Sequence, residues 1–205
     1  NVALQQAEGV KDVRYLTPSE ARALLPALNI EDIIAATFCP SDGYGDPSAV
    51  ALGYASAARR MGVTIHEGEE VTEVIVKENR VRGVTTQRGA YEARWVVNAA
   101  GPAAASIARM AGVELPIVPY RRQVFVTEPF DALGHSFPMT IDFGTSFYLR
   151  PEGPSVLIGM TDKHEPPSFK THWDEAWRAQ VVMQAMRRVP ALETARIARG
   201  WGGLY

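Results

Sequence analysis

The stretch WVVNAAGPAA, residues 95–104, decides the fold because it reads as a strand that turns at once into a helix. Trp95–Val97 are aromatic and β-branched residues, which favour a strand. Small residues follow, and a helical pattern runs over 103–110. A helix that begins directly after a strand presents free N–H groups that suit a phosphate. Close packing of the helix on the strand explains the same small residues equally well.

The composition excludes several classes of protein. A hydrophobic content of 46% and a charged content of 21% are ordinary for a globular chain of 205 residues. The net charge of −2 gives no electrostatic case for a nucleic-acid partner. No apolar run approaches the roughly 20 residues that span a bilayer. The four histidines lack metal-ligand spacing, so no metal site is expected.

The cysteine content bears on the compartment. Cys39 is the single cysteine, which excludes an internal disulfide and predicts a reducing compartment, the cytoplasm. Cys39 itself is expected to be a small buried hydrophobe rather than a thiol linked to a cofactor.

The residues around the opening stretch predict one continuous region, 47–114. Asp46 followed by Pro47 is typical of a helix start, and Gly62 marks the end of that helix. Alternating valines over 71–84 then predict a small antiparallel meander that leads into the strand at Trp95.

The remaining residues, 10–46 and 115–205, predict a second region. Thr17, Pro18 and Glu20 form a capping box that opens a helix. A buried strand is expected over 32–40 and a long strand over 115–127. A hairpin around Gly153 is followed by a helix over 171–190, in which Trp173 and Trp177 are expected in the core, and by a closing strand. We therefore expect an α+β fold with one mixed, largely antiparallel sheet and helices on one face.

Four stretches of the sequence resemble a known family. They are DGYGDPSAVALGYASAARRMGVTIHEGEEVTEV (42–74), WVVNAAGPAAASIARMAGVELPIVPYRRQVFVTEP (95–129), FYLRPEG (147–153) and GWGGLY (200–205). The chain resembles the FAD-dependent D-amino-acid oxidase family from about Tyr15 to Tyr205. Within it, the similar branch contains the glycine oxidases, sarcosine oxidases and dimethylglycine dehydrogenases.

The chain departs from this family in three respects. The family opens with a Rossmann unit that carries Gly-x-Gly-x-x-Gly, which is absent from this sequence, and it continues beyond GWGGLY. The family also often has an aromatic residue where Ala103 stands. We therefore expect the middle part of such an enzyme, with a substrate-domain segment at 1–46, an FAD-binding-domain segment at 47–114 and the substrate domain at 115–205.

The resemblance implies FAD as cofactor and assigns contacts to it. Val71 matches a strand-edge valine whose backbone pairs with adenine. Ala99, Ala100 and Gly101 match the turn near the FAD phosphates and ribose. Gly202 lies in a glycine-bearing strand, which often marks a close approach, here to the flavin ring.

The resemblance also implies the chemistry, which is oxidation of the C–N bond of a small amino acid or secondary amine by hydride transfer to flavin. The cofactor carries the difficult step, so no catalytic side chain is assigned. Tyr148 matches a carboxylate-binding tyrosine, and Arg150 shares its strand face. Arg121 and Gln123 share one face of the strand over 115–127 and complete the candidate substrate residues. Two alternatives remain open. Arg150 is an arginine in solvent at the end of the hairpin, and the strand over 115–127 is an ordinary half-exposed strand.

Two alternatives remain beside this function. The chain is a folded substrate-binding module without catalysis, or it acts on a larger substrate, such as an aminomethyl group on RNA. The near-neutral charge argues against the RNA substrate. The expected partner is therefore a small-molecule amine or amino acid, with no nucleic acid and no membrane span. The choice of amine, oxidase or dehydrogenase activity, and the oligomeric state stay open.

Overall fold

The computed structural model describes residues 2–205, and the chain divides into two compact units. The first unit runs to Tyr44 and also contains Arg122–Glu165 and Lys170–Gly203. The second unit contains Gly45–Arg121, Pro166–Phe169 and Leu204–Tyr205. Each unit has its own secondary structure and its own buried residues.

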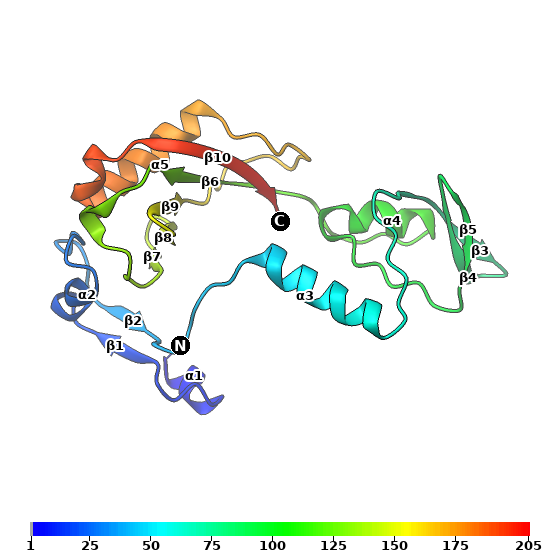
Figure 1. Ribbon diagram of the computed structural model, residues 1–205, viewed down its shortest axis with the longest axis horizontal. Coiled ribbons are helices and arrows are strands. Elements are labelled where there is room, and N and C mark those ends of the chain that lie inside the picture. The colour runs from blue at the N-terminus through cyan, green and yellow to red at the C-terminus, as the bar shows by residue number, and fades with distance from the viewer. Residues whose placement is uncertain (1) are drawn as a thin grey trace. The chain divides into compact units, whose positions relative to one another are not determined.

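The first unit is built on a five-stranded sheet in the order β10-β6-β9-β8-β7 (Figure 1). Its strands are β6 (Arg121–Thr127), β7 (Thr140–Asp142), β8 (Phe147–Glu152), β9 (Ser155–Gly159) and β10 (Ile197–Leu204). The end residues Arg121 and Leu204 of two strands are grouped with the second unit. The pairs β6–β9, β9–β8 and β8–β7 are antiparallel, as expected. Gly153, at φ 60°, makes the tight turn of the predicted β8–β9 hairpin.

Helix α5 (Glu175–Arg188) packs against β8 and β9. It begins where the Asp174 side chain accepts a hydrogen bond from the Trp177 amide. Trp177 packs against the core as expected, whereas Trp173 precedes the helix and meets the Phe125 ring edge-on at 6.0 Å. The short helices η2 (Asp131–Leu133) and η3 (Pro190–Thr194) complete this part. The buried core joins Leu16, Ala21, Leu25, Leu28, Phe125, Phe137, Phe147, Leu149, Val156, Ile158, Val181, Ala185, Val189 and Leu192.

The N-terminal elements contradict the expectation that the strand over 32–40 belongs to the main sheet. Helix α1 (Val2–Ala7) is followed by β1 (Arg14–Leu16), α2 (Pro18–Leu24) and β2 (Ala36–Phe38). The Thr17–Glu20 capping box is present at α2. However, β2 pairs with β1 in a separate two-stranded sheet, so the prediction that 32–40 and 115–127 share a sheet is wrong. Only three residues of 32–40 form a strand, and Pro40, which has no N–H, lies just beyond it.

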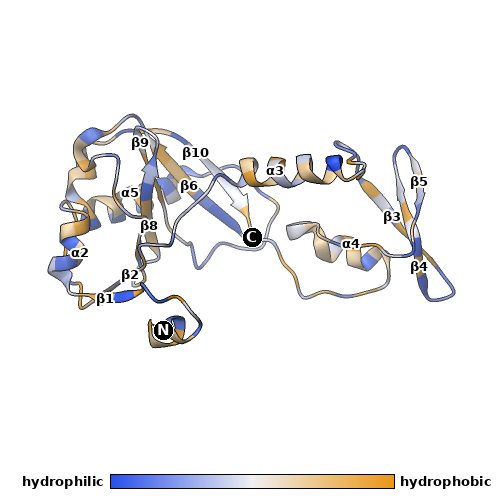
Figure 2. Cartoon of the chain, turned by 60° about the horizontal axis from the view of Figure 1, so that its bottom comes forward, coloured by the Kyte–Doolittle hydropathy of each residue, from blue (hydrophilic) through white to orange (hydrophobic). Residues whose placement is uncertain are grey.

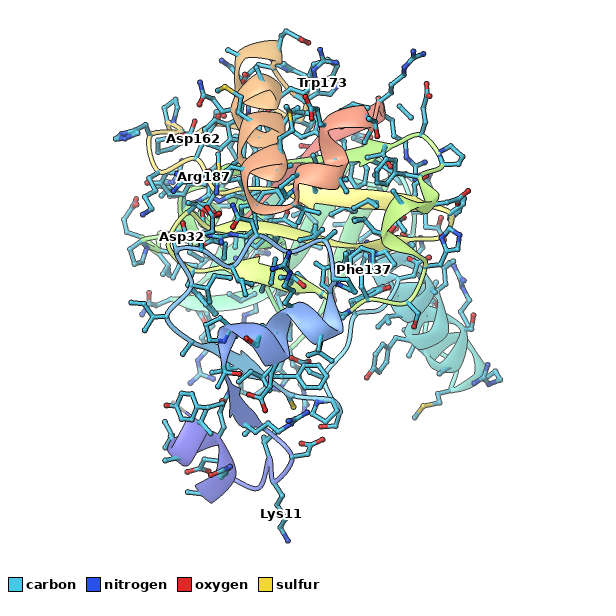
Figure 3. The ribbon with its side chains drawn as sticks, turned by 90° about the vertical axis from the view of Figure 1, so that its left-hand side faces the viewer. Lys11, Asp32, Phe137, Asp162, Trp173 and Arg187 are labelled. Carbon is cyan, nitrogen blue, oxygen red and sulfur yellow. The ribbon has the colours of Figure 1, made fainter. Side chains whose placement is uncertain are left out.

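A buried arginine ties α5 to two other segments of the first unit. Arg188 is 6% exposed, and its guanidinium donates to Asp32 (2.7 Å) and to Asp142 (2.8 Å). It also donates to the Asn29 carbonyl (2.8 Å). Arg187, labelled beside Asp32 in Figure 3, adds a bond of 3.2 Å to that carboxylate. The C-terminal end of α5 is thereby fixed to residues 29–32 and to β7.

The second unit contains the predicted helix and meander. Helix α3 (Pro47–Arg60) begins at Asp46, whose side chain accepts from two backbone amides. Strands β3 (Val71–Lys77), β4 (Arg80–Thr86) and β5 (Gly89–Glu92) form an antiparallel sheet in the order β3-β4-β5. Glu78 and Asn79 have φ values of 51° and 59°, which gives the tight turn expected between the first two strands.

The opening stretch is only partly as expected. A 3-10 turn, η1 (Gly101–Ala103), leads into helix α4 (Ala104–Met110). Ala104, Ala105 and Ala108 are buried in this helix, which packs on β3, and Figure 2 shows α4 largely in hydrophobic colours. Residues 95–97 form no strand, because no segment among residues 2–205 pairs with them.

The expected length of the strand over 115–127 and the expected burial of Cys39 were both too large. The strand expected over 115–127 begins only at Arg121, because Pro116 and Pro119 cannot donate to a ladder. Cys39 is half-exposed rather than buried, and its thiol lies 3.4 Å from the Ser41 hydroxyl. Throughout residues 2–205, no helix has both the length and the apolar character needed to cross a membrane.

Candidate active site

One face of the five-stranded sheet carries the best candidate substrate residues. Along β8 the side chains of Phe147, Leu149 and Pro151 are buried, whereas the alternate residues are only half-buried. Since alternate residues of a strand point to opposite faces, Tyr148 and Arg150 lie on the face away from the Phe147 core. The prediction that these two side chains share a face is thus confirmed by the burial pattern of β8.

Arg150 is held by its neighbours rather than free in solvent. Its guanidinium lies 2.5 Å from the Glu152 carboxylate and donates to the Pro151 carbonyl at 2.9 Å. The Tyr44 ring stacks against the guanidinium, 4.6 Å from its carbon to the ring centroid. Sequence reasoning missed both Tyr44 and Glu152. The charge of Arg150 is therefore largely balanced inside the protein.

Gln123 lies on the opposite face of the sheet. It is 2% exposed, and its side chain exchanges hydrogen bonds with Asp174, accepting from the Asp174 amide at 2.8 Å. Arg121 lies two residues before Gln123 on the same face of β6 and is 7% exposed. These two candidates therefore do not join Tyr148 and Arg150, because they belong to the side of the sheet that carries α5.

The register of the sheet identifies a different arginine. Gly159 of β9 lies directly opposite both Tyr148 of β8 and Val124 of β6. Directly opposite residues point to the same face, and Arg122 lies two residues before Val124. Arg122 therefore shares the face of Tyr148. The parity of Arg122 with Val124 was visible in the sequence, but the pairing of β6 with β9 was not.

The corner in the second unit is open and preformed. Asn98 donates through Nδ2 to the Ala104 carbonyl (2.8 Å), and its Oδ1 accepts from the Ala100 amide (3.3 Å). Ala99 and Gly101 are exposed, and Gly101 has φ +52°. A Cβ at Gly101 would meet no atom within 4 Å. A large group can thus approach this backbone closely, which fits the contact predicted with FAD.

Val71 begins β3 beside a cluster that sequence reasoning missed. It pairs with Thr86, whose hydroxyl donates to the Glu69 carboxylate at 2.5 Å. Tyr91 donates to the same carboxylate at 2.8 Å. The hydrogen bond from Thr86, reinforced by Tyr91, lowers the pKa of Glu69. The cluster fixes the edge at which Val71 is predicted to meet adenine.

Gly202 lies within β10 and is buried. Its amide already donates to the Thr171 carbonyl at 2.8 Å, so its backbone is anchored to the loop before α5. Within residues 2–205, no group of three or more His, Cys, Asp and Glu side chains could hold a metal ion.

Comparisons with known proteins identify the family of the chain. All 205 residues match the family described as FAD dependent oxidoreductase. Mitochondrial sarcosine dehydrogenase of Homo sapiens is 32% identical over 96% of this chain and 23% of its own length. The mitochondrial pyruvate dehydrogenase phosphatase regulatory subunit of Mus musculus is 29% identical over 90% of this chain and 22% of its own.

A solved structure is similar to this chain in both sequence and fold. L-proline dehydrogenase from P. horikoshii superposes with a TM-score of 0.92 at 30% identity, over 100% of this chain and 55% of that one. The chain thus spans about a quarter of the curated relatives named above and about half of this structure. The predicted family is confirmed, and the chain is similar to sarcosine and dimethylglycine dehydrogenases, as the resemblance implied. The chain belongs to the family of FAD-dependent oxidoreductases.

Proposed function

We propose that this chain is part of an enzyme that oxidises the C–N bond of a small amino acid or secondary amine. The observation that carries the proposal is the half-buried face with Tyr148 and Arg150, in a chain of an FAD-dependent family. FAD, when bound, supplies the hydride acceptor. The protein's part is to bind and orient the amine and to keep water away.

The Tyr148 hydroxyl is the proposed donor to the substrate carboxylate. A phenol gives one directional hydrogen bond, which suits a small anion held at a fixed angle. Arg150 and Arg122 lie on the same face and make the surroundings favourable for an anion, although Glu152 offsets the charge of Arg150. No side chain needs to remove a proton if the amine binds in its neutral form.

We propose the domain roles in the same terms. Residues 47–114 supply part of the FAD-binding domain, through Val71, Ala99, Ala100 and Gly101. Residues 1–46 and 115–205 supply the substrate domain, with Gly202 placed for the flavin. The main segment of the second unit, Gly45–Arg121, nearly coincides with residues 47–114 and supports this division. The single cysteine supports a reducing compartment, for which we propose the cytoplasm.

A second candidate function is a folded module without catalysis. The relative named as a phosphatase regulatory subunit favours it, because a similar chain occurs in a protein with a regulatory title. Amine oxidation by the purified natural gene product, loaded with FAD, distinguishes the two. Flavin that stays oxidised under anaerobic conditions with sarcosine, glycine, proline and dimethylglycine would favour the module.

The substitution Tyr148→Phe tests the site within the enzyme. It keeps the ring and removes one donor to a charged group, a loss of roughly 1.5–3 kcal/mol. We expect kcat/KM to fall about 10- to 150-fold, mainly through KM, with little change in Tm. Tyr54→Phe is the matched control, because Tyr54 is 77% exposed on α3. An unchanged kcat/KM for Tyr148→Phe on the best amine would remove Tyr148 from the site.

A further inference from the structure

The ring of Tyr148 does not stand upright on its own strand. An ideal Cβ built on Gly159 would lie 2.4 Å from both Cζ and the hydroxyl oxygen of Tyr148. It would lie 2.9 Å from Cε1. Since Gly159 is the direct partner of Tyr148 on the next strand, the hydroxyl end of the ring lies across β9.

Space, and not backbone conformation, requires glycine at this position. The φ of Gly159 lies outside the left-handed region, so an alanine could adopt the same backbone. The neighbouring pairs along the hairpin differ, because Leu157 faces Arg150 and Ser155 faces Glu152. Of these three partners on β9, Gly159 alone leaves room for a ring to lie flat.

We propose that Gly159 is a positioning residue for Tyr148, because it leaves the space in which the tyrosine ring lies and so fixes where the hydroxyl is presented. The inference rests on the proposed role of Tyr148 in binding the substrate carboxylate. An added methyl group at Gly159 meets the far end of a side chain that can rotate away. The cost in stability is therefore modest, whereas the position of the hydroxyl is lost.

A kinetic double-mutant cycle tests this in the natural gene product loaded with FAD. We expect Gly159→Ala to lower kcat/KM about tenfold or more, mostly by raising KM, as Tyr148→Phe does. In the Tyr148→Phe background, Gly159→Ala should add less than about twofold, because the hydroxyl is already gone. Binding of a non-oxidised carboxylate ligand, followed by flavin absorbance, should show the same pattern in Kd.

Two other glycines provide matched controls. Gly53 lies in α3, and a Cβ there meets nothing within 4 Å. Gly200 lies in β10, and its Cβ would lie 2.6 Å from Cδ1 of the Phe125 ring. Gly53→Ala should leave KM unchanged. Gly200→Ala should lower Tm, and any kinetic loss should be as large in the Tyr148→Phe background as in the wild type.

The outcomes separate this inference from the proposed function. If Tyr148→Phe is impaired but Gly159→Ala is not, or if the two losses multiply, the positioning role is wrong and the proposed function stands. If Tyr148→Phe has wild-type kinetics, the substrate role of Tyr148 fails, and the positioning role fails with it. If Gly159→Ala alone does not fold, adding Tyr148→Ala should restore folding, because it removes the ring. Failure of Tyr148→Ala to restore folding would overturn the inference.

Discussion

At the scale of single residues, Arg150 shows how a candidate binding residue is tuned by its surroundings. Its ion pair with Glu152 and its stacking on Tyr44 hold the guanidinium in one place. A held arginine loses less side-chain entropy when it meets a ligand. The same ion pair reduces the positive charge that an approaching carboxylate would meet. Arg150 is therefore well placed but weakly attractive.

The substitution Glu152→Gln should strengthen the binding of an anionic substrate. It removes the negative charge and keeps the size of the side chain. Because such a partly exposed ion pair contributes only about 0–1 kcal/mol, we expect KM for an amino-acid substrate to fall up to about fivefold. The effect should shrink at high salt. The control is Glu67→Gln, whose ion pair with Arg59 lies on the exposed surface of the other unit. A higher KM in Glu152→Gln would show that Glu152 is needed to orient Arg150.

The sequence predicted Tyr148 and Arg150 on one face, but Arg121 and Gln123, the residues chosen from β6, lie on the opposite face. Strand alternation separates Arg121 and Gln123 from Arg122 without any structure. Which of the two sets faces Tyr148 depends on how β6 pairs with β9, and that register is set by tertiary packing. The Gln123 side chain is held by a hydrogen bond to Asp174, 51 residues away, which no local pattern reveals.

At the scale of elements, local chemistry predicted starts and turns well. The capping box at Thr17, the helix start at Asp46 and the turn at Glu78–Asn79 are all present. Each depends on residues within four positions in the chain. The failures at 95–97 and 32–40 concern strands, which exist only where another strand pairs with them. Hydrophobic strand-forming residues were therefore not sufficient evidence for a strand.

Helix α5 depends on the buried Arg188, and its removal should be costly. The substitution Arg188→Met keeps the length of the stem but leaves Asp142, whose side chain is 13% exposed, without its cation. Breaking such a pair costs about 3 kcal/mol. Arg187→Met is the control, since the Arg187 side chain is 66% exposed, and it should change Tm little. Chemical unfolding followed by circular dichroism measures both variants.

The pH dependence of this loss follows from the two carboxylates. Partial burial acts to raise the pKa of Asp142, but the hydrogen bonds from Arg188 outweigh it and lower the pKa below its usual value. Hydrogen bonds from Arg188 lower the pKa of Asp32 in the same way. A lowered pKa stabilises the fold above the unfolded-state value near about 3.9, and this contribution is lost as pH falls through the folded-state pKa. The difference between wild type and Arg188→Met should thus be full at pH 7 and shrink below about pH 4; a constant difference down to pH 2 would contradict the assignment.

At the scale of the whole molecule, the candidate residues for the cofactor are divided between the two units, whereas Tyr148 and Arg150 lie in one unit. Val71 and the corner at 99–101 belong to the second unit, whereas Tyr148, Arg150 and Gly202 belong to the first. The two units differ in their buried residues. The first has a large core around Phe125 and Phe147, whereas α3 in the second has no buried side chain. The family could be predicted from motifs, but these differences in burial could not.

The 205 residues alone should bind FAD weakly. In dinucleotide-binding folds, much of the contact with the pyrophosphate comes from a Gly-x-Gly-x-x-Gly loop, and this sequence contains none. The corner at 99–101 is open, but α4 behind it is only seven residues long and has no side-chain cap. We expect the purified 205-residue protein to carry far less than one FAD per chain, measured by flavin absorbance. Circular dichroism and a cooperative thermal transition serve as controls that the protein is folded. Flavin retained at one per chain through gel filtration would contradict the expectation, because Val71, the corner and Gly202 would then suffice to hold the cofactor.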